Sequence, residues 1–275
     1  METQKPNDEF LKKLDEIIEK TCIQGQLMII ATKQHGKSNA TMWLLRRLMQ
    51  TKSHEEQKQM MIIFDTVLNW RFKFDKVPYV DYESVRNIPM VQDLIVDIGD
   101  VDSNQTRNSI GEIVMNDFIH KRELKKQLNG DVPFQNIYLI EEIQNVLGTY
   151  AMNGAMGRFW LKMVSECANY GQVIIGLGQR LADISTKVIE RSRYFLIGAT
   201  EGDNDLKKIG RMVNSKELVQ TISRLERGEF IFIDKKEKQF ATMIAFPKFV
   251  NTEKPYPFTE SLQQGGYVKR IFLGT

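Results

Sequence analysis

The segment ATKQHGKS, from Ala31 to Ser38, lies between an apolar run and a helical pattern. It matches the phosphate-loop pattern at Gly36, Lys37 and Ser38, whereas glycine is usual at the position of Ala31. Alanine fits there if the backbone does not need a positive φ. In such a loop, backbone N–H groups and the positive end of the next helix hold phosphate oxygens, the lysine reaches the β and γ phosphates, and the serine ligates Mg²⁺. We predict that ATP is bound by Ala31, Thr32, Lys33, Gln34, His35, Gly36, Lys37, Ser38 and Asn39, with Ser38 also on the metal.

Two adjacent glutamates close a later apolar run, NIYLIEE. In phosphate-loop ATPases, one carboxylate at the end of such a strand holds Mg²⁺, generally through water, and the next polarises the attacking water. We assign Glu141 to the metal, where aspartate is more usual, and Glu142 to catalysis. The alternative is that the pair begins the solvated first turn of a helix, where acidic residues favour the positive end of the dipole.

A glutamine follows a third apolar run, QVIIGLGQR. In a parallel sheet, ligands gather beyond the carboxyl ends of the strands. We therefore predict that Gln179 joins the catalytic group by hydrogen bonding to the γ phosphate or to the attacking water. The alternative is an ordinary polar residue at the start of a helix.

Short apolar runs without alternation predict strands that are buried on both faces, as in a parallel sheet. They span residues 26–32, 60–65, 93–98, 136–142, 172–178 and 193–199. Helical patterns lie between and after them, at 37–49, 106–128, 144–170, 181–189, 203–213 and 216–225. The predicted fold class is α/β with a mostly parallel sheet. The loop of residues 31–38 indicates a P-loop NTPase core, and the family resemblance given below implies that this core is RecA-like.

The two ends of the chain differ from this core. Apolar residues at helical spacing predict an amphipathic helix over 9–22. Alternation across a charged turn predicts a hairpin over 228–246, and the proline-containing remainder reads as an extended tail. We predict three parts, namely a helical lead (1–25), an ATPase domain (26–246) and a tail (247–275).

Composition excludes several classes of protein. The 38 basic and 35 acidic side chains leave a net charge of +3, so no global charge marks a nucleic-acid coat protein. Two distant cysteines and three scattered histidines argue against a structural zinc site and favour a reducing compartment. Since no apolar run approaches 18 residues and no secretory signal is present, we expect a cytoplasmic protein without membrane insertion.

Together these residues resemble the HerA/FtsK group of RecA-fold motors. The resemblance covers residues 26–213 and is carried by GKSN, YLIEE, GQRLADIS and RYFLIGATEGDNDLKKIGRMV. In the third segment, Leu181 stands where the family has proline. The resemblance implies an ATPase that uses Mg²⁺ and forms a ring, usually hexameric, around double-stranded DNA, and the compact size favours a viral or plasmid genome-packaging or DNA-transfer motor.

One departure from the family concerns catalysis. Members commonly carry an arginine before the fourth core strand that reaches the neighbouring subunit's nucleotide, but ECANYG places Ala168 there. Such an arginine is worth about 10³ to 10⁵ in turnover. The candidates to replace it are Arg158, Arg180, Arg191 and Arg193. We predict Arg158, which lies on the same helical segment; the alternative is that its stem only covers apolar surface.

Two basic clusters are candidates for contact with a DNA backbone, although such clusters are also common as solvated helix faces. They are Lys121, Arg122, Lys125 and Lys126, and Lys207, Lys208 and Arg211. Without interleaved aromatic residues, stacking on bases is not indicated. Two other functions stay open: a motor that moves protein, and a nucleotide-gated switch that hydrolyses slowly because of Ala168.

Overall fold

The computed structural model describes residues 6–50, 59–66, 70, 73–74, 77–87, 90, 92–99, 102–132, 134–237, 240–248 and 267–272, the last of these as backbone only. Its strands are β1 (Gln26–Ile30), β2 (Gln59–Asp65), β3 (Tyr79–Asp81), β4 (Leu94–Asp97), β5 (Gln135–Ile140), β6 (Gln172–Gly178), β7 (Tyr194–Ile197), β8 (Glu229–Asp234), β9 (Phe240–Ala245) and β10 (Tyr267–Phe272). Its helices are α1 (Pro6–Gln24), α2 (Lys37–Met49), α4 (Tyr82–Val85), α5 (Ser103–Gln127), α6 (Gln144–Leu147), α7 (Gly154–Glu166), α8 (Thr186–Arg191), α9 (Asp203–Val213) and α10 (Lys216–Ser223).

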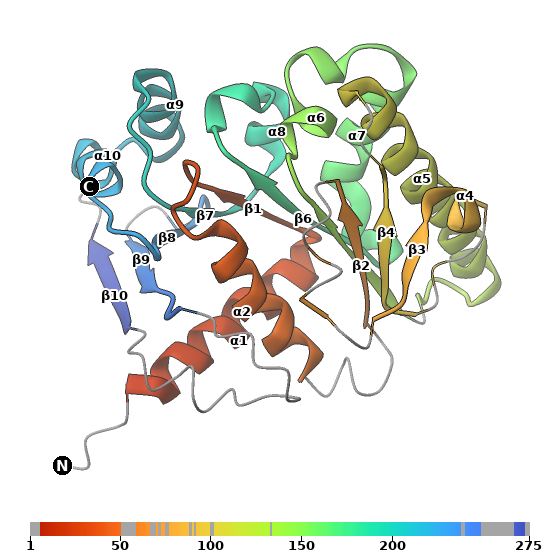
Figure 1. Cartoon of the computed structure of the whole chain (residues 1–275), viewed down its shortest axis with the longest axis horizontal. Helices are drawn as coiled ribbons and strands as arrows, with labels where there is room; N and C mark the ends of the chain where they lie inside the picture. The colour runs from red at the N-terminus through yellow and green to blue at the C-terminus, as the bar shows by residue number, and fades with distance from the viewer. Residues whose placement is uncertain are drawn as a thin grey trace.

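The described strands form one ten-stranded sheet in the order β10-β9-β8-β7-β1-β6-β5-β2-β4-β3 (Figure 1). The seven neighbouring strands β7, β1, β6, β5, β2, β4 and β3 pair in parallel. Strands β8, β9 and β10 continue the sheet beyond β7 with antiparallel pairing. The predicted α/β class with a mostly parallel sheet is therefore confirmed. Because β1, β6 and β5 are parallel neighbours, the segments that follow them meet at one edge of the sheet.

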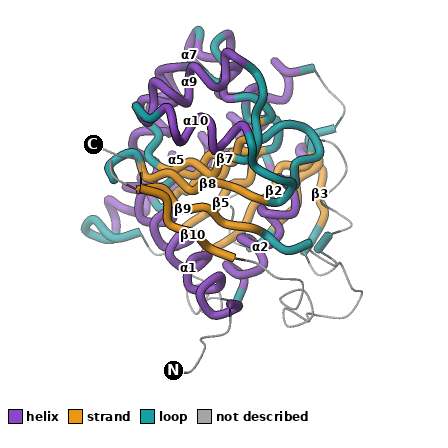
Figure 2. The backbone as a smooth tube through the Cα atoms, turned by 90° about the vertical axis from the view of Figure 1, so that its left-hand side faces the viewer, coloured by secondary structure: helices purple, strands orange, loops and turns teal. Residues whose placement is uncertain are grey.

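Helices cover both faces of this sheet (Figure 2). Within β1, Leu27 and Ile29 pack in the cluster that includes α1 and α2, whereas Met28 and Ile30 pack in the cluster that includes α5 to α10. Every residue of β1 is buried. Burial on both faces explains why the core strands read as continuous apolar runs instead of alternating ones.

Both ends of the chain join the core. The predicted leading helix is confirmed as α1, which contacts α2 and β1. The predicted hairpin is confirmed as β8 and β9. The sequence did not predict β10, which extends the sheet along β9 within the predicted tail; residues 249–266 and 273–275 of that tail lie outside the described residues.

Lys121 corrects one prediction about DNA contact. Its side chain is 0% exposed, and its ammonium donates to the carbonyl oxygens of Phe134 and Gly171, at 2.9 Å each. Burial lowers the pKa of this lysine to about 8. The side chain therefore satisfies buried carbonyls at the end of the sheet opposite the phosphate-loop edge and cannot reach a DNA backbone. Lys208 is also engaged, because its ammonium donates to the carbonyls of Ala182 and Ile184.

Candidate functional site

The loop after β1 opens directly into α2. Gly36 is the N-cap of α2 with φ of 104°, a left-handed conformation that favours glycine, and no side chain caps this end of the helix. The start of α2 is therefore a helix N-terminus of the kind whose N–H groups bind anions. Ala31 does not belong to the residues with positive φ, which meets the condition set for alanine at that position.

Two side chains of the loop anchor it to neighbouring strands. Thr32 donates from its backbone N–H and its hydroxyl to the carbonyl of Ala199, at 3.1 and 3.2 Å. The imidazole of His35 is 8% exposed, lies 3.0 Å from the carbonyl oxygen of Glu229 and contacts the ring of Phe230 edge-on. Thr32 and His35 thus hold the loop in place, and their side chains do not line the cavity described below.

Lys37 lies over its own loop. Its ammonium donates to the carbonyl oxygens of Ala31 and Thr32, at 2.6 and 3.3 Å. Burial lowers the pKa of this lysine, and the negative charges of Glu142 and Glu141 oppose that effect. The amine is therefore bound to its own loop and lies within electrostatic reach of both carboxylates.

Glu141 follows β5 and is 8% exposed. Burial raises the pKa of its carboxyl from 4.5 to about 7, and the charges of Asp65 and Glu142 act in the same direction, whereas the Trp70 indole and the charge of Lys73 lower the pKa. One carboxylate oxygen, Oε2, makes no hydrogen bond to the described residues. An oxygen that is buried and unbonded in this way is suited to a hydrogen-bonded water or a cation.

Glu142 has the backbone of a strained turn, with φ of 46°. A non-glycine residue in this conformation costs about 1 kcal/mol, and such strain is common at functional sites. The amide of Gln179 donates to Glu142 Oε1 at 2.7 Å, and the amide of Gln144 donates to Oε2. The carboxylate is therefore held from two sides by neutral donors.

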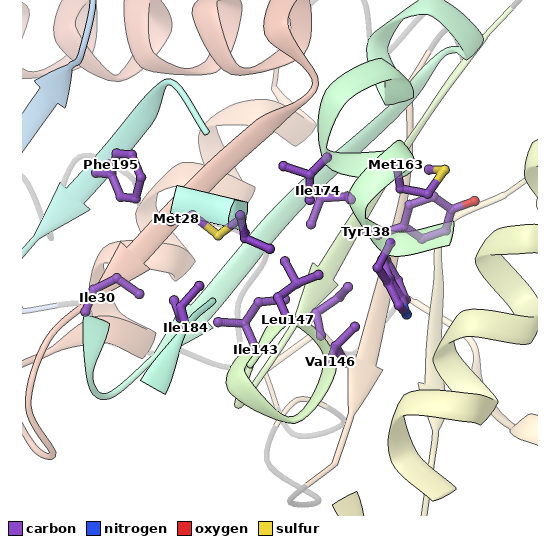
Figure 3. Packing of buried hydrophobic residues seen from close by; sticks show 14 of the residues in the cluster. Met28, Ile30, Tyr138, Ile143, Val146, Leu147, Met163, Ile174, Ile184 and Phe195 are labelled. Carbon is purple, nitrogen blue, oxygen red and sulfur yellow. The ribbon is translucent and has the colours of Figure 1, made fainter. Parts of the chain in front are cut away.

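Packing beneath the glutamates fixes their position. Figure 3 shows Ile143, Val146 and Leu147, which come directly after the pair, in one cluster with Met28 of β1 and Ile174 of β6. The N–H of Ile143 also donates to the carbonyl of Leu177, at 2.8 Å. The turn that carries Glu141 and Glu142 is thus attached to the strands on which the phosphate loop and Gln179 are built.

A cavity of about 540 Å³ lies at this edge of the sheet. It is lined by Lys33, Gln34, Gly36, Lys37, Ser38, Asn39, Glu141, Glu142, Leu177, Gln179 and Arg227. Residues from three separate segments that the sequence singled out therefore meet in one place. Arg227 and Leu177 were not predicted.

The oxygen atoms of the cavity suit Mg²⁺. Ser38 and Glu141 offer a hydroxyl and a carboxylate, and Mg²⁺ is usually held by one or two protein oxygens together with phosphates and waters. No group of three or more His, Cys, Asp or Glu side chains within the described ranges is arranged to hold a metal ion. The donor set therefore fits a metal that arrives with a nucleotide.

The four arginines considered as catalytic groups have different surroundings. Arg193 forms a two-pronged ion pair with Asp234, Arg191 donates to Leu161 and Ser165, and Arg180 contacts Asp205. Arg158 is exposed on α7 and makes no hydrogen bond to the described part of the chain. It does not line the cavity of its own subunit, so its predicted role concerns a neighbouring one.

The raised pKa of Glu141 gives a prediction for the protein without nucleotide or metal. Its carboxyl holds a proton in the folded state between pH 4.5 and about 7, whereas the unfolded chain has released it. The contribution of this group to the free energy of unfolding is therefore largest below pH 4.5. It falls as pH rises from 4.5 through 7, by up to about 3 kcal/mol in total. We expect Glu141→Gln to raise Tm relative to wild type at pH 8 and the difference to disappear near pH 4.5.

Thermal unfolding from pH 4.5 to 8 measures this effect. The matched control is Glu19→Gln, which changes an exposed glutamate of α1 and should leave the pH profile as in wild type. A Tm difference between Glu141→Gln and wild type that is constant across this range would contradict the account of Glu141.

No family model matches the sequence, and no curated protein matches it. The genome-packaging NTPase B204 of Sulfolobus turreted icosahedral virus 2, in complex with ATPγS, has a TM-score of 0.62 at 14% identity, covering 82% of this chain and 98% of that one. The bacterial conjugative coupling protein TrwB has a TM-score of 0.59 at 10% identity, and the match covers 86% of this chain and 89% of that one. VirB4 of Thermoanaerobacter pseudethanolicus has a TM-score of 0.55 at 11% identity, and the match covers 77% of this chain and 87% of that one.

The predicted RecA-like P-loop fold is therefore confirmed, as is the likeness in fold to a genome-packaging NTPase and a conjugative coupling protein. At these identities the comparison concerns fold alone. None of the helices in the described ranges is long and apolar enough to cross a bilayer.

Proposed function

We propose that this protein is a Mg²⁺-dependent ATPase that moves double-stranded DNA, as a genome-packaging or DNA-transfer motor. The observation that carries the proposal is the single cavity shared by the loop of residues 33–39, the two glutamates and Gln179. Phosphoryl transfer to water requires N–H groups that bind phosphate, a lysine and a carboxylate, all beside one cavity. The solved complexes of B204 with ATPγS, AMPPCP and AMP support nucleotide binding by this fold.

Each residue has a defined part in hydrolysis. The loop and Lys37 hold the phosphates and offset their negative charge. Ser38 and Glu141 would hold Mg²⁺, and the metal would supply positive charge beside the phosphate oxygens. Glu142 accepts the proton of the attacking water. Gln179 keeps this carboxylate oriented, since its amide already donates to Oε1. General-base catalysis of this kind contributes about 10²- to 10⁴-fold.

The motor part of the proposal rests on the sequence resemblance and on the fold shared with a packaging NTPase and a conjugative coupling protein. A ring, usually hexameric in the resembling group, would let the exposed Arg158 reach the nucleotide of a neighbouring subunit. Of the basic side chains considered for DNA, Arg122, Lys207 and Arg211 are exposed and make no hydrogen bond to other described residues.

Turnover measured with and without DNA tests this function. We expect duplex DNA to raise kcat for ATP, and we expect the DNA concentration needed for half of this effect to rise with salt, because contacts to the phosphate backbone release counterions. Single nucleotides at equal phosphate concentration serve as the control. Turnover that is the same with and without DNA would contradict the motor proposal and favour a protein-moving motor or a slow nucleotide-gated switch.

A further inference from the structure

Arg227 lines the cavity from a segment outside the phosphate-loop, glutamate and Gln179 groups. It lies in the turn between α10 and β8. Because β8 runs antiparallel to β7, its first residue stands at the edge where β7 ends, which is also the edge of the phosphate loop. A residue distant in sequence is thereby brought beside Lys37 and Ser38.

The turn is fastened to the phosphate loop by its backbone. The N–H of Gly228 donates to the carbonyl of His35 at 3.0 Å, and the carbonyl of Gly228 accepts from Phe246 at 2.8 Å. Gly228 has φ of 92°, and a Cβ built on Gly36 would lie 3.6 Å from its Cα, so the two backbones approach closely. With His35 also beside the carbonyl of Glu229, the position of residue 227 relative to the loop is fixed.

The guanidinium of Arg227 is available for a ligand. It is exposed and makes no hydrogen bond or ion pair with the part of the chain that the structure describes. Because the backbone of the turn is already fixed, only the Arg227 side chain has to become ordered when a ligand binds. The entropic cost of binding is therefore small. A guanidinium presents paired N–H donors whose geometry matches phosphate oxygens.

The charges of the cavity point to a polyanion. When both glutamates are ionised, their charges equal those of Lys33 and Lys37, so the net positive charge of the lining comes from Arg227. A nucleoside triphosphate with Mg²⁺ retains negative charge, and its binding beside two glutamates is favoured by a further cation.

We propose that Arg227 binds the phosphate chain of the nucleotide held by the loop of its own subunit. In the sheet, β8, which follows Arg227, lies on one side of β1, and β5, which precedes the two glutamates, lies on the other side. The inference rests on the proposed nucleotide site and adds a phosphate-binding residue to it. Arg227 thus acts in cis on affinity, which separates its role from that predicted for Arg158 in a neighbouring subunit.

Equilibrium binding to the full chain tests this role, with a fluorescent ATP analogue displaced by unlabelled ATP or AMP in the presence of Mg²⁺. Removing one charge-assisted contact is worth a loss of about tenfold or more in affinity. We expect Arg227→Ala to weaken ATP binding by that factor, to weaken AMP binding less, and Arg227→Lys to recover part of the loss. Arg224→Ala, a neighbouring exposed arginine outside the cavity, should bind as wild type does.

Each other result has a definite meaning. An unchanged ATP affinity in Arg227→Ala overturns the inference, and if turnover falls at the same time the residue acts on a neighbour's nucleotide. An equal loss of affinity for AMP and ATP in Arg227→Ala also overturns the inference. Arg227 would then contact only the parts that the two nucleotides share, which are the base, the ribose and the first phosphate. If Lys37→Ala binds ATP as tightly as wild type, the proposed nucleotide site itself is wrong, which is a different failure.

Discussion

Lys37→Ala is expected to weaken binding of ATP by about a hundredfold or more. The ammonium lies over the phosphate loop on carbonyl oxygens of Ala31 and Thr32, next to the cavity. On binding it exchanges those neutral acceptors for charged phosphate oxygens, and each hydrogen bond between charged groups contributes about 1.5–3 kcal/mol. Isothermal titration with ATP and Mg²⁺ measures the change in Kd.

The control for this variant is Lys12→Ala, which removes an exposed lysine of α1. Far-ultraviolet circular dichroism and Tm should show that Lys37→Ala remains folded, because removing a partly buried cation from an anion-binding end does not disturb the packed strands. A folded Lys37→Ala protein with the Kd of wild type would mean that ATP binds elsewhere.

Glu142→Gln is expected to lower kcat for ATP hydrolysis by about 10²- to 10⁴-fold while Kd for ATP changes little. The amide has nearly the shape of the carboxylate but cannot accept the proton of the attacking water. In the structure the carboxylate is held by the amides of Gln179 and Gln144 in a strained turn, so its place is fixed before ATP arrives. Single-turnover measurements with saturating enzyme separate this step from binding.

Glu19→Gln is the matched control for Glu142→Gln as well, since it makes the same chemical change on an exposed helix. A Glu142→Gln protein that hydrolyses ATP at the rate of wild type would assign the base to another residue. Loss of binding together with turnover would instead place Glu142 among the groups that hold the nucleotide and its metal.

The parts of this fold that depend on local sequence were predictable. The phosphate loop lies between a five-residue buried strand and a helix that begins at Lys37, and both elements have clear apolar patterns. The helix over 203–213 was predicted at its observed bounds. The positions of Glu141 and Gln179 followed from a general rule about the carboxyl ends of parallel strands.

The parts that depend on long-range pairing were not predictable. Arg227 reaches the cavity because β8 turns antiparallel to β7, and a run of apolar residues does not reveal the direction of its neighbour. The polar turn before β8, which contains Arg227, is the sequence signal that could have drawn attention to this residue. Lys121 looked like a surface cation because its neighbours along α5 are charged, and only the contact with Phe134 and Gly171 reveals its burial.

The measurement that tests the central claim most directly is a structure of the protein with Mg²⁺ and a non-hydrolysable ATP analogue. The account predicts phosphate oxygens on the N–H groups at the start of α2, the metal between Ser38 and Glu141, and Glu142 facing the γ phosphate. Triphosphate found away from residues 33–39, or bound there with both glutamates directed elsewhere, would contradict it.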